Sequence, residues 1–239
     1  MDHTAINRAR TLYYGMFASF FAFNFEEKNF AIITETVGVL ADHPIDDVSG
    51  EALNNMKELL QRTGYQQVKD ESDLVFYSPT TSHIPMTASY YDEQRDNGQK
   101  RIDMMNYVQN SKFRRNSTVF QENEDHIEFI ALFMQKLVED DLQGEEGADE
   151  VAKNVFENIL NQMLGPLCEK LYNHEHSVLY ENVAIVLDSF TSFERLYLGV
   201  AKPDVNEARN ATPQNKKPRK IKKAPKKMVE RNMDEFVSI

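Results

Sequence analysis

Apolar side chains recur at three- and four-residue spacing through most of the first 200 residues. The segment TAINRARTLYYGMFASFFAFNF places Ile6, Ala9, Tyr13, Met16 and Phe17 at the spacing of one helix face. Later segments repeat this spacing, among them VAKNVFENILNQML and SVLYENVAIVLDSFTSFERLYL. No segment shows a convincing two-residue alternation of apolar and polar side chains, which would indicate a half-buried strand. We therefore predict an all-α fold, with about eight helices in a single globular domain over residues 1–200.

Charge is divided unevenly along the chain. The formal net charge is −11, but residues 201–239 hold eleven basic and five acidic side chains, so the first 200 residues carry −17. An acidic body repels nucleic acid and anionic membranes at long range and attracts a basic peptide. Within the tail, PQNKKPRKIKKAPKKM places eight basic residues between Lys216 and Lys227, with two prolines among them. We predict that residues 201–239 form a disordered basic tail.

The hydropathy of the sequence indicates where in the cell the protein is expected. No stretch approaches the roughly 18 to 20 uninterrupted apolar residues that a membrane span requires. The first ten residues, MDHTAINRAR, lack the apolar core of a secretory signal. The expected location is the cytoplasm, with no membrane span.

Enzymatic and metal-binding patterns are missing from the sequence. A single cysteine, Cys168, excludes an internal disulfide and a Cys-rich metal site, and is expected to be a small buried apolar side chain. Phosphate-binding glycine motifs, a G-x-S-x-G elbow and paired E-x-x-H elements do not occur. His174 and His176 flank Glu175, but side chains two positions apart on a helix point to different sides. We predict no catalytic residue, no metal and no cofactor.

The stretch FQENEDHIEFIALFMQKL places Glu124, Asp125 and His126 at the mouth of an apolar helix. Such ionisable groups can serve as a catalytic pair, as a metal site, as a helix cap or as part of a binding groove. Adjacent residues on a helix diverge, which weakens the acid/base alternative. With Asn123 as N-cap, the two acids would complement the helix dipole and His126 would bond a neighbouring loop. The groove alternative draws on context, because a proline-containing loop precedes this site and the helix behind it is apolar.

Two further segments flank this stretch. Residues 78–88, SPTTSHIPMTA, predict an extended loop rich in hydroxyl groups. A helix is expected from Tyr90 to about Gln109, with an Asn-Gly pair that bends or breaks it. In KFRRNS, Arg114 and Arg115 are expected in a solvated loop or in contact with the acidic helix start.

Several segments, taken in order, resemble a known family. An R-x-x-x-Y helix is present as RTLYYGMF, VFYSP at 75–79 is similar to L-F-x-G-P, and PMTASY at 85–90 is similar to P-W-x-S-x-Y. The most specific element, E-x-x-D-H before an apolar helix, has Glu122, Asp125 and His126 in place. These segments, with FERLYL in the last helix, resemble the TorD/DmsD/NarJ-like redox enzyme maturation proteins over most of residues 1–200.

The resemblance implies a cytoplasmic, non-enzymatic chaperone with a TorD-like helical bundle. Its implied partners are the twin-arginine signal peptide and the apo catalytic subunit of a molybdoenzyme, with formate dehydrogenase as the first candidate client. In that family the proline loop and the D-H helix start line the region implicated in peptide binding. By position, the candidate peptide-binding residues are Phe76, Pro85, Met86, Tyr90, Glu122, Asp125 and His126.

The chemistry of these residues fits such a ligand. A twin-arginine leader offers two guanidinium groups followed by an apolar stretch, and Asp125 could accept a bidentate hydrogen bond from an arginine. Met86, Met134 and Phe76 could supply adaptable apolar contacts, although core packing is the alternative for Met134. The sequence departs from the family at Met86, where tryptophan is common, and at Ala88, where serine is common, which bears on peptide specificity.

The alternative hypothesis is a helical interaction protein whose basic tail binds nucleic acid, ribosomes or anionic lipid. The acidic body and the lack of aromatic residues within the Lys/Arg run disfavour nucleic acid. A hydrolase built on Asp125 and His126 lacks a recognisable nucleophile. A homodimer is left open by the sequence.

Overall fold

The computed structural model describes residues 2–203, and within them every regular element is a helix. The predicted all-α class is confirmed. Because the π-helical segment η2 joins α8 to α9, the ten α-helical segments of this part of the chain form nine continuous helices. The elements are α1 (His3–Phe20), α2 (Glu27–Ala41), α3 (Asp47–Arg62), α4 (Tyr65–Ser72), η1 (Asp73–Tyr77), α5 (Ala88–Glu93), α6 (Gln99–Asn110), α7 (Ile127–Leu142), α8 (Ala148–Val155), η2 (Phe156–Leu160), α9 (Asn161–Tyr172) and α10 (Leu179–Leu198).

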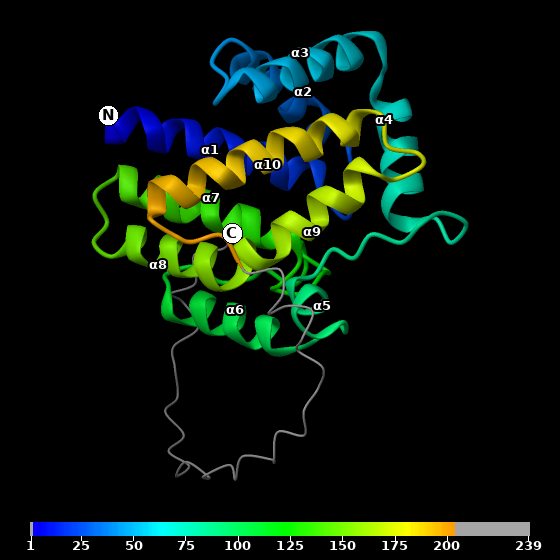
Figure 1. The fold of residues 1–239 in the computed structure, drawn as a ribbon. Helices are drawn as coiled ribbons and strands as arrows, with labels where there is room; N and C mark the ends of the chain where they lie inside the picture. Colours follow the sequence, from blue (N-terminus) through cyan, green and yellow to red (C-terminus); the bar gives the residue numbers. More distant parts are fainter. Residues whose placement is uncertain (1, 204–239) are drawn as a thin grey trace.

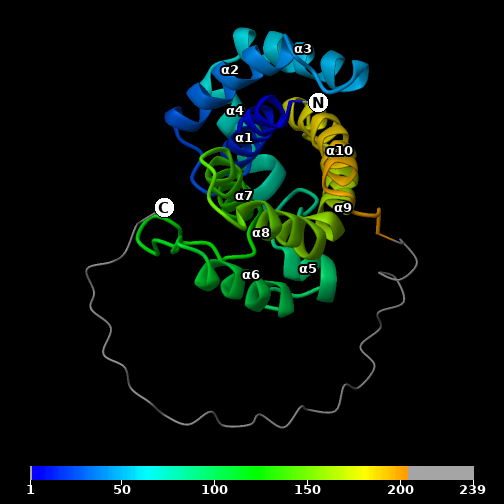
Figure 2. The same ribbon diagram turned by 90° about the vertical axis from the view of Figure 1, so that its left-hand side faces the viewer.

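The helices are arranged around α1 and α7, which pack along each other. Helix α2 contacts both α1 and α3, and α10 packs against α3 and α9 (Figure 1). Figure 2 shows α2 and α3 above this group and the short helices α5 and α6 below it. None of the helices within residues 2–203 is long and apolar enough to cross a membrane.

Large aromatic side chains fill the core. Those that are less than 2% exposed include Phe20 and Phe21 from the end of α1, Phe129 from α7 and Phe190 from α10. Burying one such side chain stabilises the fold by about 1.5–3 kcal/mol. The predicted apolar face of α7 is confirmed, and its members are buried: Ile127, Ile130, Met134, Leu137 and Val138. Met134 is therefore a core residue, and Cys168 is buried as expected.

A buried ion pair joins α1 to α10. Arg10 donates from its Nε and Nη2 to the two carboxylate oxygens of Glu194, at 2.6 and 2.9 Å. Tyr14 donates its hydroxyl to Glu194 at 2.8 Å, and the Asn7 side-chain oxygen accepts from Arg10 at 2.8 Å. Burial and the Glu194 charge raise the pKa of Tyr14, so its hydroxyl remains a donor. The R-x-x-x-Y residues of RTLYYGMF and the glutamate of FERLYL therefore hold each other in place.

The predicted helix from Tyr90 to Gln109 is divided. Helix α5 ends at Glu93 and α6 begins at Gln99. Gln94 and Asn97 adopt positive φ angles of 55° and 58°, a left-handed conformation that ends a right-handed helix. The loop expected at 78–88 contains no helix before Ala88, where α5 starts.

The basic tail predicted for residues 201–239 lies outside the described residues beyond Pro203. At its start, the Ala201 carbonyl accepts a hydrogen bond from the Asn161 side chain at 2.9 Å. This contact ties the chain leaving α10 to the beginning of α9.

Candidate functional site

A short antiparallel bridge joins the proline loop to the start of α7. Thr87 pairs with His126, the Ala88 N–H donates to the Asp125 carbonyl, and the Ile127 N–H donates to the Met86 carbonyl, both at 2.9 Å. Residues about 40 positions apart in the sequence are thereby held side by side. The structure thus brings together three of the predicted site residues, Met86, Asp125 and His126.

Asp125 points into the protein. Its side chain is 0% exposed, and its Oδ2 accepts the Ser89 N–H at 3.0 Å, in the first turn of α5. Its Oδ1 is buried without a hydrogen-bond partner among the described residues. The aspartate therefore supports the N-terminus of α5, a helix remote in sequence, rather than the helix that comes after it.

His126 caps α7. Its backbone is extended, its Nδ1 accepts the Glu128 N–H at 3.3 Å, and the residue is 3% exposed. Burial lowers the pKa of His126 to about 4, so the imidazole is neutral near pH 7. The predicted N-cap, Asn123, was wrong, because the bridge to Thr87 holds residue 126 extended and the helix cannot begin earlier.

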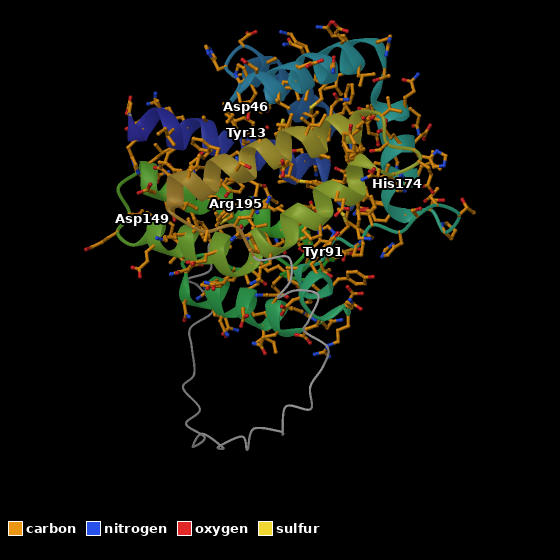
Figure 3. All side chains as sticks on the ribbon, viewed as in Figure 1. Tyr13, Asp46, Tyr91, Asp149, His174 and Arg195 are labelled. Carbon is orange, nitrogen blue, oxygen red and sulfur yellow. The ribbon has the colours of Figure 1, made fainter. Side chains whose placement is uncertain are left out.

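The other predicted residues surround this bridge. Phe76 is buried, with ring centroids 6.0 Å from Phe21 and 5.0 Å from Tyr180. Pro85 is buried, and its carbonyl accepts a hydrogen bond from the hydroxyl of Tyr91 at 2.9 Å. Tyr91 belongs to α5 and is labelled in Figure 3. Tyr90 and Glu122 are half-buried. Of the seven candidates, only these two are not fully buried.

The outer part of the proline loop is held by the turn between α9 and α10. His174, which is labelled in Figure 3, lies within hydrogen-bond distance of the Ser82 carbonyl, at 3.0 Å. The Ser82 N–H donates to the Glu175 carboxylate at 2.8 Å. Backbone N–H groups of Glu175 itself and of Ser82 lower the pKa of the Glu175 carboxyl to about 2. His174 and Glu175 thus serve as loop anchors, and no group of three or more potential metal ligands occurs among residues 2–203.

The neighbouring acid, Glu124, is neutralised by two arginines. Arg101 and Arg115 approach its carboxylate oxygens at 3.1 and 3.2 Å. Arg115 also donates to the Glu122 carbonyl. The expected contact of the Arg114-Arg115 pair with the acidic helix start is therefore made by Arg115. Arg114 instead donates to backbone carbonyls around the end of α6.

A pocket of about 420 Å³ opens beside this region. It lies where the end of α1, the start of α2, the start of α7 and the segment before α7 meet. Three of its apolar side chains are well exposed, Phe23 at 37%, Ile32 at 45% and Val119 at 62%. Its carboxylates come from Glu26, Glu122 and Glu128. The pocket thus combines negative charge with accessible apolar surface, and it includes one predicted residue, Glu122.

Glu128 was not predicted as a site residue. Its Oε2 accepts the Phe23 N–H at 2.9 Å. Burial, reinforced by the charge of Glu122, raises the pKa of Glu128 to about 7, although the Phe23 hydrogen bond and the charge of Lys28 oppose this shift. Burial and Asp96 also raise the pKa of Glu122. From the sequence, Glu128 is indistinguishable from an ordinary acid in the first turn of a helix. Only its position two residues after the D-H pair could have drawn attention to it.

Comparison with known proteins identifies a family. A family model described as the nitrate reductase delta subunit matches residues 42–172, more than half of the chain. The matched region extends from the turn before α3 to the end of α9 and contains the bridge and all seven predicted residues. No curated protein and no solved structure matches the chain.

Proposed function

The chain belongs to the nitrate reductase delta subunit family, and we propose on this premise that it is a maturation chaperone for a molybdenum-containing redox enzyme. The family match carries the proposal and agrees with the resemblance to redox enzyme maturation proteins. The chaperone acts by binding, in the cytoplasm, and catalyses no reaction itself.

The proposed ligands are the twin-arginine signal peptide and the apo catalytic subunit of the client, with formate dehydrogenase as the first candidate. A net charge of −17 on residues 1–200 supports this choice, because it speeds the encounter with a basic leader. The exposed apolar side chains beside Glu122 and Glu128 support it as well, since the leader continues into an apolar stretch.

The seven predicted residues are proposed as the peptide-binding region. Tyr90 and Glu122 are the members that offer surface, while Asp125 and His126 fix the proline loop against α7. In this arrangement the buried members act by holding the shape of the surface that the peptide contacts.

Binding one state of the client is sufficient for the proposed role. A chaperone that binds the apo subunit and its leader, and not the mature enzyme, stabilises the apo state by mass action. Export and proteolysis of the leader are delayed until the cofactor is inserted.

Co-expression tests the proposal. The tagged chaperone is produced with candidate molybdoenzyme catalytic subunits, each with and without its leader, in cells able or unable to make the molybdenum cofactor. We expect capture of the apo subunit, strongest when the leader is present, and release when the cofactor is made. Equal capture of apo and cofactor-loaded subunits would contradict the proposal.

A further inference from the structure

We infer that the pocket between α1, α2 and α7 receives an arginine side chain of the bound leader, with the carboxylates of Glu122 and Glu128 as acceptors. This inference rests on the proposed function and assigns the site at which the protein binds the basic part of the leader.

The charges around the pocket are unequally compensated. Glu124 pairs with two arginines, and Glu26 pairs with Lys28 at 2.8 Å. The charges of Arg115 and Lys28 act on Glu122 and Glu128 respectively. Within residues 2–203, however, these two cations form their ion pairs with Glu124 and Glu26, and neither Glu122 nor Glu128 forms one. Two acids that face the pocket and are not paired with a cation in this part of the chain are therefore available to an incoming one.

Glu128 is also held ready for a ligand. The Phe23 N–H donates to its Oε2 at 2.9 Å, which orients the carboxylate on the first turn of α7. Among residues 2–203 its other oxygen has no hydrogen-bond donor, so it can accept from a ligand. Its raised pKa reports the cost of keeping this charge partly buried beside Glu122. A bound guanidinium would offset that cost, so part of the binding free energy comes from relief of electrostatic strain in the free protein.

The rim of the pocket suits both an arginine and the apolar residues next to it in a leader. Phe23 packs edge-on against Tyr77, with 5.5 Å between ring centroids, and both rings are partly exposed. An arginine can stack its planar guanidinium group on such a ring while it donates hydrogen bonds to carboxylates. Ile32 and Val119 then offer apolar contact to the adjoining residues of the peptide.

Asp125 does not fit the role of arginine acceptor in this conformation. It has no exposed surface and already binds the Ser89 N–H. The occupant of the pocket is a peptide with arginine followed by apolar residues, because lysine lacks the planar fork that can reach two carboxylates.

A mutant cycle tests the inference by calorimetry. A panel of synthetic twin-arginine leaders, each with a matched peptide in which both arginines are glutamine, is titrated into the full chain. The wild-type protein is compared with Glu122→Gln/Glu128→Gln. A matched control, Glu51→Gln/Glu58→Gln, removes two charges from exposed positions on α3. Glutamine at 128 can still accept the Phe23 N–H, so the variant is expected to fold.

For the wild type and the control we expect the arginine peptide to bind about tenfold to a hundredfold tighter than its glutamine counterpart. In Glu122→Gln/Glu128→Gln this preference is expected to fall to near one. A preference retained in that variant overturns the inference and leaves the proposed function standing. Failure of every leader to bind the wild type contradicts the proposed function, and the inference with it.

A carboxyl-carbon NMR titration gives an independent readout on the unmodified chain. The pKa of Glu128 is expected to fall when the arginine peptide binds and to stay unchanged with the glutamine peptide. An unchanged pKa in the presence of the arginine peptide would overturn the inference.

Discussion

The Asp125 carboxylate accepts the Ser89 N–H at 3.0 Å and thereby joins the start of α5 to the turn that precedes α7. Both groups are buried, and the carbonyl of the same aspartate accepts the Ala88 N–H. One residue thus holds the end of the proline loop through both its backbone and its side chain.

Asp125→Ala is expected to lower the free energy of unfolding by about 2 kcal/mol, because the buried Ser89 N–H loses its acceptor. Asp125→Asn should cost less, about 1 kcal/mol, since the amide oxygen can still accept. Urea denaturation followed by circular dichroism measures both values. Glu122→Gln, at a partly exposed position, serves as the control and should stay within about 0.5 kcal/mol of the wild type.

If Asp125→Ala were as stable as the wild type, the bond to Ser89 would contribute nothing to the fold. Leader affinity is to be measured on the same variants at a temperature where all are folded. In that way a loss of peptide binding can be separated from a loss of native protein.

The buried Arg10–Glu194 ion pair is the basis of a second prediction about stability. Arg10→Met leaves the Glu194 carboxylate buried without its cation and is expected to cost about 3–5 kcal/mol. The double variant Arg10→Met/Glu194→Leu removes both charges and should recover at least about 2 kcal/mol of that loss. Denaturation of the two single variants and the double variant completes the cycle. Additive losses would mean that the two side chains do not interact.

His126 and Glu128 are expected to make the free energy of unfolding depend on pH in opposite directions. The pKa of His126 is lowered from 6.5 to about 4, so its contribution is present above pH 6.5 and is lost as the pH falls toward 4. The pKa of Glu128 is raised from 4.5 to about 7, so its contribution is present below pH 4.5 and is lost as the pH rises toward 7. In the wild type the two slopes largely cancel over this range.

Single substitutions should reveal each slope. As the pH falls from 6.5 to 4, the free energy of unfolding of Glu128→Gln is expected to drop by on the order of 2 kcal/mol relative to that of the wild type. His126→Asn, in which asparagine can still cap α7, should instead lose stability as the pH rises from 4.5 to 7. The measurement is the unfolding free energy across this range. Parallel profiles for wild type and both variants would contradict these pKa shifts.

Removal of the basic tail separates the two functional hypotheses. A chain ending at Pro203 keeps the Asn161–Ala201 contact, so its stability is expected to stay within about 0.5 kcal/mol of the full chain. Leader binding should persist at no lower affinity, because removal of the basic tail leaves a more acidic protein that attracts a basic leader more strongly. Retention on RNA or anionic vesicles, if the full chain shows any, should be lost. Loss of leader binding in the truncated chain would assign the tail to client recognition.

Local pattern was sufficient to predict much of the fold. The stripe from Ile127 to Val138 is buried as its spacing predicted, because helical periodicity directly specifies which side chains face a core. The break between α5 and α6 was expected at the Asn-Gly pair, and Asn97 does adopt a left-handed conformation. Its extent, from Gln94 to Gly98, depends on contacts that the sequence does not display.

The site was harder to predict for a physical reason. Whether an acid near a helix start faces solvent or the interior depends on its long-range partners: Ser89 for Asp125, and Phe23 for Glu128. Phe23 lies 105 positions away from Glu128 in the sequence. The segment resemblance indicated the family that the matched model shows. It could not distinguish a buried loop anchor from an acid that faces a pocket.

Calorimetric titration of the full chain with twin-arginine leaders from several molybdoenzymes, each paired with a twin-lysine control, tests the central claim most directly. The account predicts micromolar or tighter binding of at least one leader, as expected for an interface worth about 8 kcal/mol, with clear weakening in its twin-lysine form. Absence of binding to every leader, or equal affinity for the twin-arginine and twin-lysine forms, would contradict it.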